Sequence, residues 1–242
     1  MSLLLHEVNV RFGHTTALDR FSFEFPAAGI VALIGENGAG KSTALDVLSG
    51  FITPTSGEIL ESANRRHIGR ASLRNRSARL HQANVLPPLL TPTEYLRVVR
   101  FPEKATWLVA IGGQTRAIGN ITGTIPEAVV RMLDKASVEF HRPIASHSLG
   151  QQRTLALAAT LIVRKPILLL DEPFSSLSDD VSRHASELIR TEAERRLVVF
   201  AEHDIPHAME LAGTVLVLKA GQLKTSFAAA KHHYSDLLQY FG

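Results

Sequence analysis

The residues best suited to chemistry lie in the glycine-rich stretch 35–43, which reads GENGAGKST. This spacing fits the pattern of a phosphate-binding loop, in which backbone N–H groups surround the phosphates of a nucleotide and a helix dipole adds positive charge. Lys41 can reach the β- and γ-phosphates, and the Ser42 hydroxyl can bind Mg²⁺. The pattern therefore predicts a nucleotide site formed by Gly35, Glu36, Asn37, Gly38, Ala39, Gly40, Lys41, Ser42 and Thr43.

Two acidic residues, Asp171 and Glu172, follow the apolar run 167–170. Taken alone, such a pair is more often a helix cap or a surface pair. A strand over this run would place both carboxylates at the carboxyl edge of a sheet, the edge that also presents the phosphate-binding loop. Asp171 then suits Mg²⁺, usually through water, and Glu172 suits activation of the water that attacks the γ-phosphate.

The elements that must position these residues are strands buried on both faces. The run 30–34 is continuously apolar and precedes the loop. The segment 41–48, which follows the loop, has the apolar periodicity of a helix. Similar apolar runs at 167–170, 197–201 and 214–218 alternate with helical patterns. This alternation predicts an α/β fold with a parallel sheet flanked by helices.

Two further regions accompany this core. Residues 5–25 alternate apolar and polar positions around a break at Gly13, as expected of a small β lobe. Residues 92–147 contain helix-compatible stretches at 94–99 and 127–135 and no convincing buried strand. We predict that this region forms a helical insertion.

The composition is that of a globular protein. The 242 residues are 45% hydrophobic and 20% charged, which disfavours disorder, and the absence of cysteine excludes disulfides and thiolate metal sites. The longest stretch without a charged residue, 80–93, is too short to span a membrane, and the first residues do not form a signal peptide. We expect a cytosolic protein.

Arginine is concentrated in an acid-free region between Ser62 and Thr93. This distribution could serve an anionic lipid surface or nucleic acid. A solvated face is the favoured interpretation, because no aromatic residues alternate with the arginines as single-strand stacking would require. The arginines concerned are Arg65, Arg66, Arg70, Arg74, Arg76 and Arg79.

With these motifs the sequence resembles the nucleotide-binding subunit of ABC transporters, over nearly the whole chain from Leu5 to about Leu223. Residues 148–152, SLGQQ, are similar to the signature motif of that family and lie 23 residues before Asp171, the spacing expected without a gap.

The resemblance implies roles for three further residues. Gln82 is similar to the hinge glutamine, a catalytic and Mg²⁺-binding position, and His203 to the switch histidine that contacts the γ-phosphate. Phe12 is similar to the aromatic residue that stacks on adenine. Taken singly, each has a simpler interpretation: surface for Gln82, a satisfied histidine for His203, core for Phe12, and for Ser148 a helix cap.

The resemblance also implies the architecture. Residues 1–242 would form a single ABC ATPase domain, with a P-loop NTPase (RecA-like) parallel core, an antiparallel β subdomain and an inserted α-helical subdomain. The catalytic lobe would comprise 1–82 and 151–242, and the helical subdomain about 83–150.

The same resemblance implies the partners. Two subunits, identical or related, would hold ATP and Mg²⁺ between the phosphate-binding loop of one and Ser148, Gly150 and Gln151 of the other. Their opening and closing would power a separate transmembrane permease at the cytoplasmic face of the membrane, with no nucleic acid expected as a partner.

Four positions depart from the family pattern. Leu149 stands where glycine is usual, Arg153 lies one position earlier than the usual arginine, and Ser178 replaces an aspartate that contacts the second subunit. Phe12 lacks the hydroxyl of the commoner tyrosine, although stacking remains possible.

Two other classes of protein compete with a transport ATPase. A soluble ABC protein acting on nucleic acid or ribosomes usually has two cassettes, a long coiled coil or cysteine-bound zinc, whereas this chain has one cassette and no cysteine. An unrelated phosphate-loop kinase or GTPase is disfavoured because the guanine-reading motif is missing and a kinase does not need the signature.

Overall fold

The computed structural model describes residues 2–83, 85–100 and 125–231. Residues 101–124 of the predicted helical insertion lie outside the described residues. The chain divides into two compact units. The first contains Met1–Gln82, Lys165–Pro173 and Arg190–Gly242, and the second contains Ala83–Arg164 and Phe174–Ile189.

The first unit contains a six-stranded sheet in the order β10-β9-β3-β8-β7-β6. Its strands run parallel except β10, which pairs antiparallel with β9. The apolar runs noted in the sequence form β3, β7, β8 and β9, so the parallel core is confirmed. The strands are β3 (Gly29–Ile34), β6 (Ser77–Leu80), β7 (Ile167–Asp171), β8 (Leu197–Glu202), β9 (Thr214–Lys219) and β10 (Gln222–Ala228).

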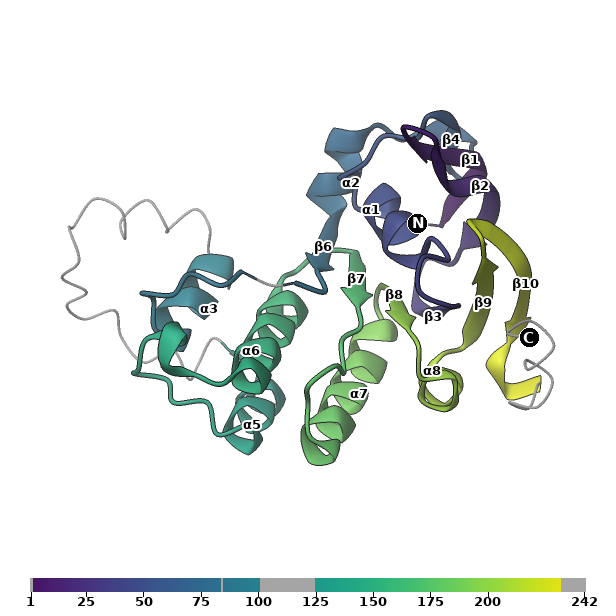
Figure 1. Cartoon of the computed structure of the whole chain (residues 1–242). Helices are drawn as coiled ribbons and strands as arrows, with labels where there is room; N and C mark the ends of the chain where they lie inside the picture. Colours follow the sequence, from purple (N-terminus) through teal and green to yellow (C-terminus); the bar gives the residue numbers. More distant parts are fainter. Residues whose placement is uncertain (1, 84, 101–124, 232–242) are drawn as a thin grey trace. The chain divides into compact units, whose positions relative to one another are not determined.

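An antiparallel sheet of four strands, ordered β2-β1-β4-β5, forms the predicted β lobe of the same unit. Figure 1 shows α1 (Lys41–Leu48) between the two sheets, and one hydrophobic cluster includes residues of both sheets and of α1. This shared core fixes the helix that follows the phosphate-binding loop. The strands are β1 (Leu3–Phe12), β2 (Thr15–Phe25), β4 (Ser56–Glu61) and β5 (Arg66–His67).

Helices α1 and α8 (Ile205–Leu211) pack on the parallel sheet, α1 against β7 and β8 and α8 against β3. A short helix, α2 (Arg70–Arg76), leads into β6, and the 3₁₀ turn Ala229–Lys231 follows β10. The apolar periodicity did not predict α2 or β6, because both lie in the arginine-rich region.

The described residues of the second unit contain helices and no strand, in agreement with the predicted helical insertion. Helix α6 packs against both α3 and α5. For this reason α6 and most of α7 cluster with the helical unit, whereas the sequence predicts that residues from 151 onward belong to the catalytic lobe. The helices are α3 (Pro92–Arg100), α5 (Glu127–Lys135), the 3₁₀ turn Ile144–Ser146, α6 (Leu149–Ile162) and α7 (Asp179–Ala193).

That the two units form a single ABC ATPase domain stays a prediction.

Among the described residues, none of the helices combines the length and the apolar character needed to cross a bilayer.

Candidate nucleotide-binding and catalytic site

The loop between β3 and α1 is held in place by its backbone. Gly40 caps α1 with φ +101°, and a Cβ there would lie only 2.5 Å from the carbonyl oxygen of Ala17 in β2. The Ala39 N–H donates to the Glu36 oxygen at 3.1 Å, and the Ala39 oxygen accepts from the Gly221 N–H at 3.1 Å. Only glycine fits at position 40, and the loop is fixed before the helix begins.

Lys41, the first residue of α1, is buried at this loop. Its Nζ donates to the Gly35 oxygen at 2.6 Å and to the Glu36 oxygen at 3.0 Å. Burial lowers the pKa of Lys41, and the negative charges of Glu172, Asp171 and Glu202 oppose that shift. The amine therefore lies among loop carbonyls, near the strand-end carboxylates.

The two predicted carboxylates lie at the end of β7, as expected. Asp171 is the last residue of the strand and is buried. Glu172 follows with φ +46°, and its N–H donates to the Ala201 oxygen of β8 at 3.0 Å. This left-handed conformation is uncommon for a residue other than glycine and marks a sharp turn away from the strand direction.

Gln82 and His203 both approach Glu172. The Gln82 Nε2 donates to Glu172 Oε2 at 3.0 Å, and His203 Nδ1 lies 4.0 Å from Glu172 Oε1. His203 Nδ1 also lies 3.1 Å from Oε1 of the buried Glu202, which accepts the His203 N–H at 2.8 Å. The three residues predicted to be catalytic are thus brought together within the first unit.

A pocket of about 270 Å³ opens beside the loop and is lined by Gly35, Glu36, Asn37, His203 and Ile205. Pockets that enclose a drug-sized ligand are usually about 300–1,000 Å³. The pocket is smaller than that range and lies directly beside the phosphate-binding loop.

Oxygen donors of the type that Mg²⁺ prefers are close to the loop. The guanidinium of Arg79 contacts both the Ser42 carbonyl oxygen, at 3.5 Å, and Asp171 Oδ2, at 2.9 Å, so these two residues share a neighbour. The described residues contain no group of three or more His, Asp or Glu side chains that could hold a metal ion. The contact with Ser42 is to its backbone oxygen, and binding of Mg²⁺ by Ser42, Gln82 and Asp171 stays a prediction.

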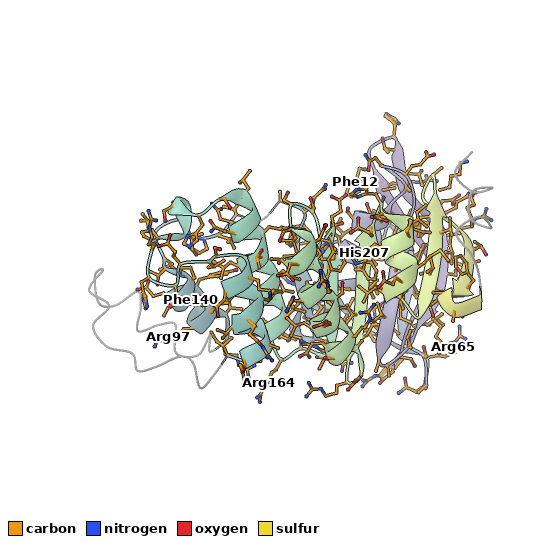
Figure 2. All side chains as sticks on the ribbon, turned by 90° about the horizontal axis from the view of Figure 1, so that it is seen from below. Phe12, Arg65, Arg97, Phe140, Arg164 and His207 are labelled. Atoms are coloured by element: carbon orange, nitrogen blue, oxygen red, sulfur yellow. The ribbon has the colours of Figure 1, made fainter. Side chains whose placement is uncertain are left out.

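Phe12 ends β1 and is 53% exposed. Figure 2 labels it. The alternative interpretation of Phe12 as a core residue is therefore wrong, and its ring is available for stacking.

The signature residues lie in the second unit, at the start of α6. Ser148 caps the helix: its Oγ accepts from the Gln151 N–H at 3.3 Å, and Gln151 Oε1 accepts from the Ser148 N–H at 2.8 Å. Gln151 Nε2 also donates to the Ser137 oxygen at 2.7 Å. A Cβ on Gly150 would lie 2.7 Å from the Ser176 oxygen, so the chain allows no side chain there.

Helices α6 and α7 form in spite of the departures from the family pattern near their starts. Leu149 is 81% exposed, and Arg153 is buried within α6. The Ser178 oxygen accepts from the Ser182 N–H at 2.8 Å, where α7 begins.

Sequence reasoning missed two charged residues of the site, Arg79 and Glu202. Arg79 was assigned to a solvated face, and Glu202 lies at the end of an apolar strand. The position of Glu202 directly before His203, at the carboxyl end of β8, is the signal that could have found it.

The fold and the loop define a phosphate-loop nucleotide-binding protein. The sequence model of the ABC transporter family matches residues 18–175. Because this match covers more than half of the chain, the chain belongs to the ABC transporter family and contains its ATP-binding cassette, as the resemblance predicted.

Two curated relatives illustrate the similarity. The chain is 32% identical over 223 residues to the thiamine import ATP-binding protein ThiQ of Haemophilus ducreyi, covering 90% of this chain and 96% of that protein. It is 30% identical over 219 residues to the arabinose import ATP-binding protein AraG of Chromohalobacter salexigens, covering 89% of this chain but only 42% of that protein.

Solved structures share the fold. A dimeric ATP-binding cassette in a post-hydrolysis state with ADP and Pi has a TM-score of 0.72 and 24% identity, covering 94% of this chain and 98% of that one. A bacterial Atm1-family ABC exporter with ATP bound has a TM-score of 0.76 and 23% identity, covering 100% of this chain and 40% of that one.

Proposed function

We propose that this chain hydrolyses ATP to power import of a substrate through a separate transmembrane subunit. The observation that carries the proposal is the convergence of Lys41, Gln82, Asp171, Glu172 and His203 at one edge of the parallel sheet. These residues come from four distant parts of the chain, and together they match the needs of phosphoryl transfer to water.

Nucleotide binding uses the loop and its flanking residues. The phosphates would enter the pocket beside Gly35, Glu36 and Asn37, where Lys41 can exchange its carbonyl partners for phosphate oxygens. The exposed ring of Phe12 would stack on adenine. Ser42, Gln82 and Asp171 would hold Mg²⁺, which when bound neutralises charge on the β- and γ-phosphates.

Hydrolysis requires a base beside the γ-phosphate. The Glu172 carboxylate would accept the proton of the attacking water while oxygen bonds to the γ-phosphorus and the bond to ADP breaks. Gln82 holds one oxygen of Glu172 and His203 lies beside the other, so the carboxylate is kept in one orientation. His203 also lies close enough to the loop pocket to donate to the phosphate.

We further propose that the site is completed by a second subunit. In the second unit, the capped start of α6 presents Ser148 and backbone N–H groups beside the exposed Leu149, a suitable surface for a γ-phosphate. The dimeric cassette with ADP and Pi supports this arrangement by similarity of fold.

The proposed direction of transport and the proposed permease partner rest on the relatives, whose names describe import ATP-binding proteins. A transmembrane permease subunit would hold the chain at the cytoplasmic face of the membrane. Thiamine and arabinose are the substrates named for those relatives.

Affinity purification of the tagged chain from its own organism tests the proposal. We expect Mg²⁺-dependent ATP hydrolysis and copurification of a hydrophobic membrane subunit. Copurification of RNA or ribosomes in place of a membrane subunit would instead support the soluble ABC class, and a chain that binds no nucleotide would contradict both.

A further inference from the structure

Arg79 differs from the other arginines of its segment. Its side chain is only 8% exposed, so the interpretation of the whole segment as a solvated face is wrong at this position. Arg65, labelled in Figure 2, is exposed, as are Arg66 and Arg74. Arg79 lies in β6, the strand that pairs with β7, and this pairing brings it beside the strand-end carboxylates.

The guanidinium of Arg79 joins two acidic residues. Its Nη2 lies 2.9 Å from Asp171 Oδ2 and 3.2 Å from Asp46 Oδ1, and its Nε donates to the same Asp46 oxygen at 3.3 Å. Nη2 is also 3.5 Å from the Ser42 carbonyl oxygen. One cation therefore links α1, β6 and the end of β7.

The charge at this position is permanent. Arginine keeps its proton at any physiological pH, and a carboxylate buried as deeply as Asp171 requires a compensating cation. Arg79 is a cation in direct contact with Asp171, and the amine of Lys41 adds a second positive charge nearby. A metal ion that used Asp171 would have to approach a carboxylate whose Oδ2 already accepts from a guanidinium, against the repulsion of a like charge a few ångströms away.

We propose that Arg79 sets the metal dependence of nucleotide binding in this protein. By compensating Asp171, the guanidinium weakens the binding of Mg²⁺ at that carboxylate and lowers the electrostatic cost of binding nucleotide without metal. Arg79 acts through Asp171 and is a positioning residue. The inference rests on the proposed function, because it takes Asp171 as a metal ligand.

The test compares the affinity for a non-hydrolysable ATP analogue with and without Mg²⁺, measured by calorimetry. Arg79→Met removes the charge and keeps an unbranched apolar side chain. In this variant we expect the dissociation constant without Mg²⁺, divided by the dissociation constant with Mg²⁺, to rise about tenfold or more. The Mg²⁺ concentration that gives half of the gain in nucleotide affinity should fall. Arg79→Lys keeps the charge and should stay within about threefold of the wild-type ratio.

Arg74→Met is the matched control, because it removes the same charge from an exposed position of the same segment. Its ratio should equal that of the wild type. If thermal unfolding shows that Arg79→Met is not folded, Arg79→Gln, which is polar but uncharged, replaces it with the same expected shift.

Two results would overturn the inference. If Arg79→Met weakens binding equally with and without Mg²⁺, Arg79 is merely structural, and if neither affinity changes, it has no role in binding. In both cases the proposed function stands, because the wild type still binds the Mg²⁺–nucleotide. A wild type that binds nucleotide under neither condition would contradict the proposed function and this inference together.

Discussion

The sheet edge of the first unit and the start of α6 in the second are built from different kinds of contact. At the sheet edge, Gln82 and Glu172 are 90 residues apart in the chain, and Arg79 and Asp171 are 92 apart. At the start of α6, the side chains of Ser148 and Gln151 each hydrogen-bond the backbone N–H of the other, three residues apart. The proposed catalytic groups therefore depend on strand pairing in the first unit, whereas the cap at the start of α6 is formed by residues three positions apart and is supported by contacts with Ser137 and Ser176.

The contrast indicates how the proposed tasks are divided between the two units. Gln82 and His203 already lie beside Glu172 within one chain, and the Ser148 cap is formed without a partner. On this account, the first unit supplies the chemistry and the signature of a second subunit only closes the site.

Replacement of Glu172 by glutamine should have the largest effect. Glu172→Gln keeps the hydrogen bond from Gln82 but removes the base, so turnover should fall by about 10²-fold or more while ATP still binds. ATPase assays and light scattering would measure turnover and an ATP-stabilised dimer. Full activity in this variant would remove Glu172 from the mechanism.

Gly150→Ala tests whether the start of α6 is a rigid preformed surface. The new Cβ would meet the Ser176 backbone oxygen at 2.7 Å, and we expect a loss of about 1–3 kcal/mol in the free energy of unfolding. Gly69→Ala is the matched control, because it has no atom within 4 Å of the new Cβ and an ordinary φ. Equal stability of the two variants in denaturant unfolding would contradict the close approach.

Phe12→Ala should have the smallest effect. Loss of stacking should weaken ATP binding by about 1–2 kcal/mol, with little change in stability, because the ring is exposed. Calorimetric titration with ATP measures this. Phe51→Ala removes another exposed aromatic ring, one that contacts His81, and should leave ATP affinity nearly unchanged. An unchanged affinity in Phe12→Ala would assign adenine to another residue.

The parts of the fold that could be predicted from sequence are those with a local signal. Apolar runs identified β3, β7, β8 and β9, and the spacing of glycines and Lys41 identified the loop. Strand β6 has only four residues, and its arginine resembles that of an exposed segment. The ion pair between Arg79 and Asp171 follows from strand order, which a local pattern does not encode.

Site residues show the same limit. Asp171 and Glu172 follow from the end of a strand, whereas Gln82 and His203 were found only through the resemblance to a family. Their contacts with Glu172 arise because β6 and β8 flank β7 on its two sides.

In the proposed dimer, the phosphate-binding loop of one chain meets the signature of another. Asn37→Cys and Leu149→Cys place thiols at exposed positions beside the loop glycine and beside Ser148, in a chain with no native cysteine. Each change is introduced into a separate copy of the chain that carries Glu172→Gln, and the two copies are mixed under mild oxidation. We expect a disulfide-linked dimer that forms with ATP, and not with ADP or with either copy alone. Absence of a crosslink in the presence of ATP, when both copies bind it, would contradict the shared site.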